Sequence, residues 1–395
     1  MSKVVCPYCF ESFDSSEVMF RCSNQTGCTK TDDAQLHKYW GGDQLETPCF
    51  KGPKKLFGGA PDSAKCPSCG NTSYWVICPH CHNRIPKQMV KTKGYIISII
   101  GARSSGKTNY ITTLINELMQ RGYCLGNVGT VASNVANKPE NNTQARYERD
   151  FFNVMYKNGK CPPQTAINDP KNRIPLIYEL SQKGKKPLYL VIYDTAGENF
   201  ADPRNIVANV KFLQHSDACI YVLDTFSIPY VHEKIKGKYG LPDIELRFDA
   251  ILSNVNTYFT EGDARIRDEQ FKKPLALVLS KIDAILTNEE LFRDTSIEGM
   301  SIERNSSFLD GCGVNLSDME SISDSIKAAL RYYWGESNFV DNIENRYKNY
   351  HYFGISALGG MPDKNNNINN LRPYRVLDPL VWILHEFKYS LPIAK

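Results

Sequence analysis

The sequence contains no apolar run long enough to cross a membrane. A bilayer-spanning helix needs roughly 20 mainly apolar residues, and no stretch of this chain approaches that length. The N-terminal segment MSKVVCPYC lacks the apolar centre of a secretion signal, and the C-terminal SLPIAK carries no lipidation motif. These absences predict a cytoplasmic protein without a membrane partner.

Excess charge is also scarce. The 395 residues include 47 Lys and Arg against 43 Asp and Glu, which gives a formal net charge of +4. All of this excess lies in residues 1–93, where 12 basic side chains accompany 8 acidic ones, while the remaining residues hold 35 of each. Nucleic-acid binding usually needs a dense basic stripe, so nucleic acid is a possible partner but not a favoured one.

Cysteine, by contrast, is abundant and clustered. Nine of the 13 cysteines lie between Cys6 and Cys81, mostly as C-x-x-C pairs, and the other four are scattered. In a chain without a secretion signal, such clustering predicts metal thiolates rather than disulfides. Residues 1–90 also show little apolar periodicity, as expected for a module that is held together by metal. We therefore expect two domains, a double zinc ribbon at 1–90 and a second domain at 91–395.

The spacing of the cysteines predicts two structural zinc sites. CPSCGNTSYWVICPHC carries two C-x-x-C pairs eight residues apart, which predicts tetrahedral zinc ligation by Cys66, Cys69, Cys78 and Cys81. The other zinc site is predicted to be formed by Cys6, Cys9, Cys22 and Cys28. Cys49 and His37 remain alternatives to Cys22 or Cys28. All four positions of such sites are filled, so no catalysis is expected there.

Beyond residue 91 the pattern changes to alternating strands and helices. YIISIIG at 95–101 is a β-branched run ending in glycine, which is typical of a strand buried on both faces. Further strands are predicted at 175–182, 187–194, 218–224, 274–283 and 352–358, and helices at 107–121, 143–157, 244–259, 316–336 and 377–390. This alternation predicts an α/β fold with a mostly parallel sheet and helices on both faces.

The segment GARSSGKT follows the first of these strands and matches the phosphate-binding pattern G-x-x-x-x-G-K-[ST]. Lys107 is expected to reach the β- and γ-phosphates, and the hydroxyl of Thr108 to bind Mg²⁺. Phosphate oxygens are expected to meet backbone N–H groups of the loop, at Gly101, Ser104, Ser105 and Gly106.

Three later motifs lie at the ends of predicted strands. Asp194 ends the strand at 187–194 and is placed to hold Mg²⁺ through water, while the N–H of Gly197 is placed to contact the γ-phosphate. SKID at 280–283 and SAL at 356–358 come next. In their order, GARSSGKT, DTAG, SKID and SAL resemble the corresponding motifs of TRAFAC-class P-loop GTPases, and the resemblance covers about residues 95–390.

This resemblance implies GTP as the nucleotide and Mg²⁺ as a cofactor. Asp283 would accept from the guanine N1–H and the exocyclic amine, and the stem of Lys281 would lie along the base plane. In Ser356, Ala357 and Leu358, the N–H of Ala357 would meet guanine O6. Ser280 stands where the family has Asn or Thr, so tight binding is less assured than the choice of base.

Two residues at the phosphate end depart from the small-GTPase pattern. Glu198 follows the glycine where Ras-like members have a Gln that positions water, and a carboxylate beside the γ-phosphate is repelled. Hydrolysis is therefore expected to be slow without a partner, unless Glu198 is simply solvated. Arg103 is either an arginine finger, in cis or across a dimer, or a solvated loop residue. Thr130 and Thr143 are both candidates for the switch threonine.

The combination of two zinc ribbons and an elaborated GTPase domain resembles the bacterial double-GTPase families of conflict or antiviral systems. The resemblance implies protein partners, such as a second GTPase, and a homodimer is possible. We expect a GTP-hydrolysing switch with a zinc-ribbon docking module. The alternatives are a catalytically silent nucleotide-dependent scaffold, an ATPase, and a nucleotide-gated binder of nucleic acid. The short connector at 83–94 predicts that the ribbons pack near the GTPase sheet.

Overall fold

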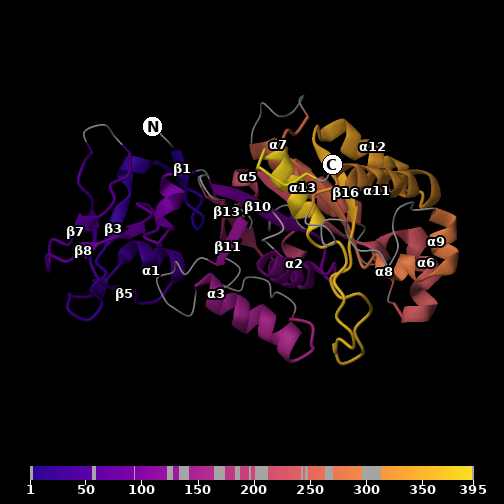
Figure 1. The fold of residues 1–395 in the computed structure, drawn as a ribbon, viewed down its shortest axis with the longest axis horizontal. Coiled ribbons are helices and arrows are strands. Elements are labelled where there is room, and N and C mark those ends of the chain that lie inside the picture. Colours follow the sequence, from indigo (N-terminus) through magenta and orange to yellow (C-terminus); the bar gives the residue numbers. More distant parts are fainter. Residues whose placement is uncertain are drawn as a thin grey trace. The chain divides into compact units, whose positions relative to one another are not determined.

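Figure 1 shows the computed structural model of the protein as a ribbon coloured along the sequence. The chain divides into two compact units that interleave along the sequence. The first unit comprises Met1–Ile96, Val131–Tyr147 and Pro170–Tyr193, and the second comprises Ile97–Thr130, Glu148–Asp169 and Asp194–Lys395. Within them the structure describes residues 3–55, 59–92, 94–121, 128–132, 142–163, 174–182, 187–194, 197–200, 212–241, 243–244, 248–262, 270–295 and 313–393. None of the helices in these ranges is long and apolar enough to span a bilayer.

The cysteine-rich part of the first unit consists of short strands around one small helix. Three two-stranded antiparallel pairs, β1-β2, β4-β5 and β7-β8, and a three-stranded sheet in the order β6-β3-β9 supply most of its regular structure. Its elements are β1 (Lys3–Val5), β2 (Ser12–Asp14), β3 (Met19–Arg21), β4 (Thr31–Asp32), α1 (Ala34–Trp40), β5 (Leu45–Glu46), β6 (Cys49–Lys51), β7 (Ala64–Lys65), β8 (Thr72–Ser73) and β9 (Trp75–Ile77). Strands of two or three residues bury little apolar surface, so this part needs stabilising contacts other than an apolar core.

The same unit also contains a longer antiparallel pair. Strands β12 (Leu176–Gln182) and β13 (Leu188–Tyr193), both predicted as strands, pair antiparallel, and every residue of β13 is buried. Strand β13 ends against the cysteine-rich part, because the hydroxyl of buried Tyr193 donates to the carbonyl oxygen of Pro7. The Tyr193 ring also lies 5.5 Å from that of Phe10 between centroids. The cysteine-rich part and strand β13 therefore contact each other within the first unit.

The second unit is built on parallel strands. From Ile97 onward, β10 (Gly94–Ile100) pairs with β14 (Ala218–Asp224), which pairs in turn with β15 (Leu275–Ser280) and then β16 (Tyr350–Gly354). These strands are buried almost throughout, which agrees with their continuous apolar sequences. The helices include α2 (Lys107–Arg121), α6 (Pro229–Tyr239), α7 (Phe248–Gly262), α8 (Asp283–Leu286), α9 (Glu289–Thr295), α11 (Leu316–Ala328), α12 (Ser337–Arg346) and α13 (Asp378–Glu386). The chain is thus mixed α/β with a mostly parallel sheet.

The helical stretch predicted at 316–336 is present in the structure. Helix α11 ends at Ala328 and continues directly into the π-helical segment η10 (Ala329–Tyr333). Gly335 then takes a left-handed conformation with φ 75°, and α12 begins at Ser337. A left-handed residue cannot continue a right-handed helix, so this glycine separates the predicted stretch from α12.

Candidate nucleotide site and cysteine clusters

The loop after β10 has the backbone that its glycines require. Gly101 has φ 154°, and a Cβ atom there would lie 2.3 Å from the carbonyl oxygen of Val222 in β14. Ser104 and Gly106 are left-handed, with φ 61° and 86°. Helix α2 begins directly afterwards, so the loop ends at a helix N-terminus whose N–H groups and dipole favour an anion.

The lysine of this loop is folded over the loop itself. Lys107 is buried, and its Nζ donates to the carbonyl oxygens of Gly101 at 2.9 Å and Ala102 at 2.7 Å. An ammonium group held at this loop is placed to donate charge-assisted hydrogen bonds to phosphate oxygens bound beside it.

The two predicted magnesium ligands meet at the start of α2. The Oγ1 of Thr108 lies 3.2 Å and 3.4 Å from the carboxylate oxygens of Asp194. Mg²⁺ prefers oxygen ligands and retains several waters, so one hydroxyl and one carboxylate beside a phosphate loop fit this ion. The structure therefore brings together residues that are 86 positions apart in the sequence.

Gly197 lies against the phosphate-binding loop. A Cβ atom at this position would be 2.3 Å from the backbone nitrogen of Arg103 and 2.7 Å from the carbonyl oxygen of Ala102. No larger residue fits this approach without moving the loop, which explains the glycine of DTAG in physical terms. The side chain of Glu198 lies outside the described part of the chain.

The two candidate switch threonines are not equivalent. Thr143 is buried in the first unit, at the start of α3 (Thr143–Arg146), where its Oγ1 accepts from the backbone N–H of Ile177 at 3.0 Å. Its hydroxyl thus ties α3 to β12. Thr130 belongs to β11 (Val128–Ala132), and its side chain lies outside the described residues.

The SKID motif lies at the end of β15, as predicted. Ser280 Oγ donates to the carbonyl oxygen of Leu223 at 3.0 Å. Lys281 is left-handed with φ 57°, and its Nζ lies 2.8 Å from Asp224 Oδ2 and 4.7 Å from the centroid of the Phe226 ring. Asp224 and Phe226 were not among the predicted site residues, although the segment LDTF that contains them lies at the end of the predicted strand 218–224.

Asp283 is buried at the first turn of α8, and this burial changes its titration. Desolvation raises the pKa of the Asp283 carboxyl above its ordinary value, while hydrogen bonding with Ser356 partly offsets that rise. Ser356 is itself fixed, because its N–H donates to Tyr374 O at 3.1 Å and its Oγ accepts from Gly359 N at 2.8 Å. Asp283 and the SAL segment therefore form one connected group.

All four motifs of the second unit line one cavity of about 340 Å³. A volume near 300 Å³ or above is typical of small-molecule sites. Predicted residues in its wall are Arg103, Ser104, Gly106, Lys107, Thr108, Gly197, Ser280, Lys281, Asp283, Ser356, Ala357 and Leu358. The remaining wall includes residues that the motifs did not indicate, namely Asn109, Tyr110, Cys161, Pro162, Pro163, Ile355, Gly360, Met361, Pro362 and Asn366.

Part of that additional wall is a short bridge between two loops of the second unit. The N–H of Cys161 donates to Asn366 O at 2.9 Å, and the N–H of Ile368 donates to Gly159 O at 2.7 Å. Asp363 holds the second loop in place, because its carboxylate accepts from the N–H groups of Asn365 and Asn367. The asparagine-rich segment at 363–368 is thus hydrogen-bonded into the rim of the cavity.

The structure gathers the eight predicted cysteines into two groups of four, but with a different division from the one predicted. One group contains Cys6, Cys9, Cys78 and Cys81, and the other contains Cys22, Cys28, Cys66 and Cys69. The predicted division followed the order along the chain, with each site formed locally. Instead, each site joins an early pair to a late pair, and Cys49 and His37 belong to neither site.

Strand pairing explains this crossed arrangement. Strands β3 and β9 are antiparallel, with Met19 opposite Ile77 and Arg21 opposite Trp75. Cys22, which follows β3, therefore lies at the end where β9 begins, close to the knuckle of Cys66 and Cys69. Cys78 follows β9 and lies at the opposite end, near the first knuckle.

The spacing of the sulfur atoms fits zinc. Four sulfurs about 2.3 Å from one zinc ion in a tetrahedron lie about 3.8 Å apart. The observed Sγ–Sγ distances are 3.7 Å for Cys6 and Cys81, and 3.8 Å for Cys9 and Cys78. In the other group they are 3.5 Å for Cys22 and Cys69, and 3.9 Å for Cys28 and Cys66. All are far longer than a disulfide bond of about 2.0 Å.

The three C-x-x-C pairs, Cys6/Cys9, Cys66/Cys69 and Cys78/Cys81, share the same backbone turn. In each, the N–H of the residue after the second cysteine donates to the carbonyl oxygen of the first, at 2.9–3.1 Å. That residue is left-handed in every case: Phe10, Gly70 and His82. Although desolvation raises the pKa of the Cys66 thiol, N–H groups of Cys69 and Ser68 outweigh it and lower the pKa to about 7. At Cys66 the turn therefore stabilises the thiolate, the form that binds metal, whereas burial raises the pKa of the Cys6 thiol in the same kind of turn.

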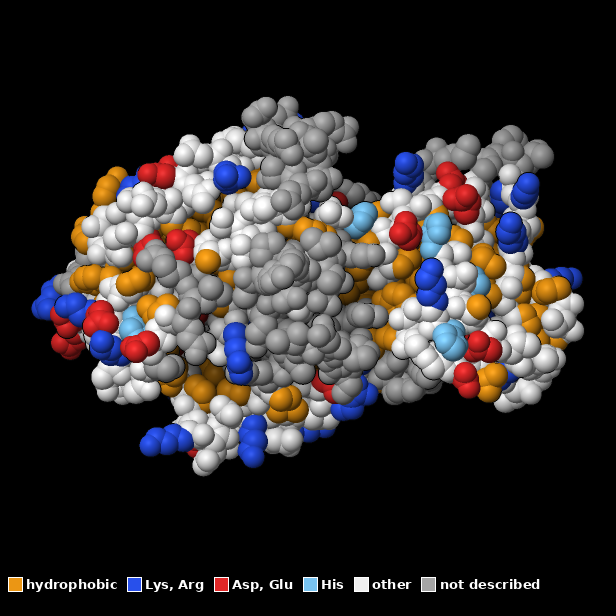
Figure 2. All heavy atoms as spheres, turned by 180° about the vertical axis from the view of Figure 1, so that it is seen from behind, with side chains coloured by type: hydrophobic (Ala, Val, Ile, Leu, Met, Phe, Trp, Pro, Cys, Tyr) orange, Lys and Arg blue, Asp and Glu red, His pale blue; other side chains and the backbone are white. Residues whose placement is uncertain are grey.

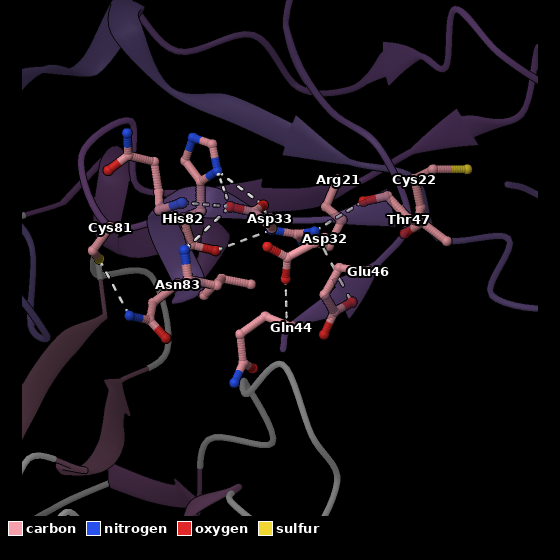
Figure 3. A network of polar contacts seen from close by, with 12 residues as sticks. Arg21, Cys22, Asp32, Asp33, Gln44, Glu46, Thr47, Cys81, His82 and Asn83 are labelled. Atoms are coloured by element: carbon pink, nitrogen blue, oxygen red, sulfur yellow. Dashed lines mark hydrogen bonds and ion pairs between the residues drawn. The ribbon is translucent and has the colours of Figure 1, made fainter. Parts of the chain in front are cut away.

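A buried polar network supports the cysteine clusters (Figure 3). Asp33, mostly buried, lies 2.6 Å from Arg21 Nη2 and 2.7 Å from His82 Nδ1. Its burial alone would raise the Asp33 pKa, but His82 and Arg21 reverse this and hold it well below its usual range. Asn83 Nδ2 donates to Cys81 Sγ at 3.3 Å, so this segment contacts the cluster directly. The network therefore ties α1 and β3 to the last knuckle.

Comparison with known proteins gives one relative over nearly the whole chain. A protein of Mycolicibacterium smegmatis, SaeC, whose name gives a proposed role in ESX-1 scaffolding and assembly, is 23% identical over 98% of this chain and 99% of its own length. No family model matches the chain. Among solved structures, the nucleotide-analogue complex of the small GTPase Arl6 (BBS3) from Trypanosoma brucei is similar at 10% identity, covering 75% of this chain and 99% of that one. The TM-score of this match is 0.26.

Proposed function

We propose that the protein binds GTP in the cavity of the second unit and hydrolyses it to GDP and phosphate. The observation that carries this proposal is the convergence of the four motifs on that one cavity. Phosphate would bind the loop of residues 101–107, and the ion held by Thr108 and Asp194 would neutralise charge on the β- and γ-phosphates. Arg103 and Glu198 are the candidates for promoting or slowing the hydrolytic step.

The choice of guanine rests on Asp283. A carboxylate can accept from the N1–H and exocyclic amine of guanine, whereas adenine presents an acceptor at N1 and would leave buried polar groups unpaired. Ser356 and Ala357 lie in the same wall of the cavity, beside Asp283. Asp283→Asn is therefore expected to shift the preference from guanosine towards xanthosine nucleotides, and an unchanged preference would count against this role.

Turnover is tested with purified protein and the Lys107→Ala variant. The proposal expects phosphate release from GTP by the unmutated protein and none above background from Lys107→Ala, because that variant lacks the ammonium group at the loop. Absence of turnover in the unmutated protein, even when candidate partners are added, would remove the enzymatic part of the proposal.

The two cysteine groups are proposed to hold structural zinc. Support comes from the sulfur separations and from the filled coordination that four thiolates provide. In this proposal residues 1–90 form a rigid double ribbon and 91–395 the GTPase domain. The ribbon module would dock protein partners, a role suited to its exposed Leu45 and Tyr74.

A scaffold without turnover is the second candidate function. It is favoured by the relative SaeC, whose name refers to scaffolding and assembly and which matches this chain over nearly its full length. In such a protein the bound nucleotide would fix the conformation of the second unit without being consumed. Binding of GTP with no phosphate release would support this candidate. The conflict-system context remains a prediction from the sequence resemblance.

Nucleic-acid binding is the weakest alternative. On the face drawn in Figure 2, the described Lys and Arg side chains are scattered among acidic ones rather than gathered in a stripe. Dispersed charge of this kind provides no continuous track for a phosphate backbone. Retention of the protein on immobilised nucleic acid at physiological salt would support this alternative.

A further inference from the structure

One side chain beside the cavity has a role that the four motifs do not assign. Asp224 is the last residue of β14, directly opposite Ser280 in the parallel pairing with β15. Two strands that end side by side place the residues of their exits in contact. Asp224 therefore lies next to the residues proposed to recognise the base.

Asp224 uses its two carboxylate oxygens in different ways. Oδ1 accepts from the backbone N–H of Phe226 at 3.0 Å, which caps the short helix η8 (Thr225–Ser227). Oδ2 lies 2.8 Å from Lys281 Nζ. The first bond fixes the carboxylate relative to the backbone, so the second one fixes the lysine.

The aromatic ring of Phe226 completes the support for this lysine. Lys281 Nζ lies 4.7 Å from the ring centroid, within the range of a cation–π contact. Phe226 is itself buried and stacks on Tyr239, with centroids 5.7 Å apart. The ammonium group is thus held between a carboxylate and a ring that have their own fixed positions.

The backbone of the same two strand exits is tied together as well. Ser280 Oγ donates to Leu223 O, and Thr225 Oγ1 donates to Ser280 O. The ion pair is only partly open to water, since the side chains of Lys281 and Asp224 are 26% and 14% exposed. A charge pair shielded to this degree restrains a side chain more firmly than a surface pair does.

We propose that Asp224 is a positioning residue for nucleobase recognition, acting through Lys281. By holding the lysine against Phe226, Asp224 sets the path of the Lys281 stem, which lines the cavity next to Asp283. The guanine plane would then pack on a stem that is already ordered, which lowers the entropic cost of binding. This inference rests on the proposed guanine-nucleotide function.

The test compares two ligands that both carry phosphates, of which only one carries a base. GDP uses both the phosphate loop and the base motifs, whereas inorganic tripolyphosphate uses only the loop. Asp224→Asn removes the charge that holds Lys281. It is expected to weaken GDP binding about tenfold, the scale of one charge-assisted hydrogen bond, and to leave tripolyphosphate binding unchanged.

Two further variants complete the test. Asp224→Glu keeps the charge and is expected to recover part of the GDP affinity. Glu233→Gln serves as the matched control, because it neutralises a carboxylate that pairs with Lys236 on the exposed surface of α6. It is expected to leave both affinities at the wild-type value.

Three outcomes would overturn the inference. GDP affinity of Asp224→Asn equal to that of the wild type would do so. An equal loss of tripolyphosphate affinity would also do so, because it would show general damage to the site. If Asp224→Asn does not fold, the Phe226→Leu variant is measured in its place. A GDP affinity of Phe226→Leu equal to that of the wild type would then overturn the inference. A wild-type protein that binds tripolyphosphate but not GDP would overturn the proposed function itself.

Discussion

At the scale of single residues, the close approach of Gly197 to the phosphate-binding loop is the most sharply defined feature. Its missing side chain leaves room for the backbone of Arg103 and Ala102. The sequence predicted a role for this glycine through the DTAG motif, but only in contact with phosphate. The packing against the loop depends on the folded chain and could not be read from the motif.

Gly197→Ala is therefore expected to destabilise the protein by about 1–3 kcal/mol, the usual cost of overpacking, and to weaken nucleotide binding. Thermal unfolding and GDP titration measure the two effects. Gly237→Ala is the matched control, since nothing lies within 4 Å of a Cβ atom at that position in α6. This control should gain about 0.5–1 kcal/mol of stability, and equal behaviour of the two variants would contradict the packing argument.

The buried carboxylate of Asp283 predicts a conflict between stability and binding. Since burial raises its pKa, the folded state binds a proton more readily than the unfolded state does. The free energy of unfolding should therefore fall as pH rises from the ordinary carboxyl value through the raised one. Above that window the ionised side chain destabilises the nucleotide-free protein.

Asp283→Asn is accordingly expected to raise the melting temperature of the nucleotide-free protein at pH 7 while weakening its binding of GDP. The gain should shrink as the pH is lowered towards the ordinary carboxyl range. Calorimetry at several pH values measures the difference from the wild type. A melting temperature at pH 7 below that of the wild type would contradict the predicted sign.

At the scale of elements, sequence patterns predicted local structure well and pairings less well. Helix α2 and strand β14 have the predicted bounds, because apolar periodicity and the phosphate loop are local signals. Helix α6 was not predicted, although Pro229 at its first turn and left-handed Gly240 after its end are recognisable signals. The division of the cysteines was missed because it depends on the register of β3 against β9, which spacing along the chain does not encode.

The crossed cysteine groups make a prediction about zinc content. Cys9→Ser with Cys81→Ser removes ligands from one group, so this double variant should lose one zinc ion and keep the other. Cys9→Ser with Cys22→Ser removes a ligand from each group and should lose both. Metal analysis of the purified variants gives the counts. A local division of the sites would reverse these two results, and Cys49→Ser should retain both ions in either case.

At the scale of the whole molecule, the central claim is that the second unit binds a guanine nucleotide. The α/β class and the gathering of the motifs at strand ends could be predicted, because carboxyl ends of parallel strands meet at one edge of a sheet. The rim formed by Cys161 and Asn366 could not be predicted, because backbone hydrogen bonds join its two loops and such bonds leave no residue-specific signal in the sequence. Asp224 was missed for a similar reason, since its partner is 57 residues away.

The most direct test is competition for a fluorescent GDP analogue bound to the unmutated protein in the presence of Mg²⁺. We predict that GDP and GTP displace the probe at concentrations about a hundredfold below those of ADP and ATP. The reason is that polar groups of the site that pair with guanine are left without hydrogen bonds when adenine binds. Lys107→Ala should bind the probe weakly. Displacement by ATP at the same concentration as GTP would contradict the assignment of guanine to this cavity.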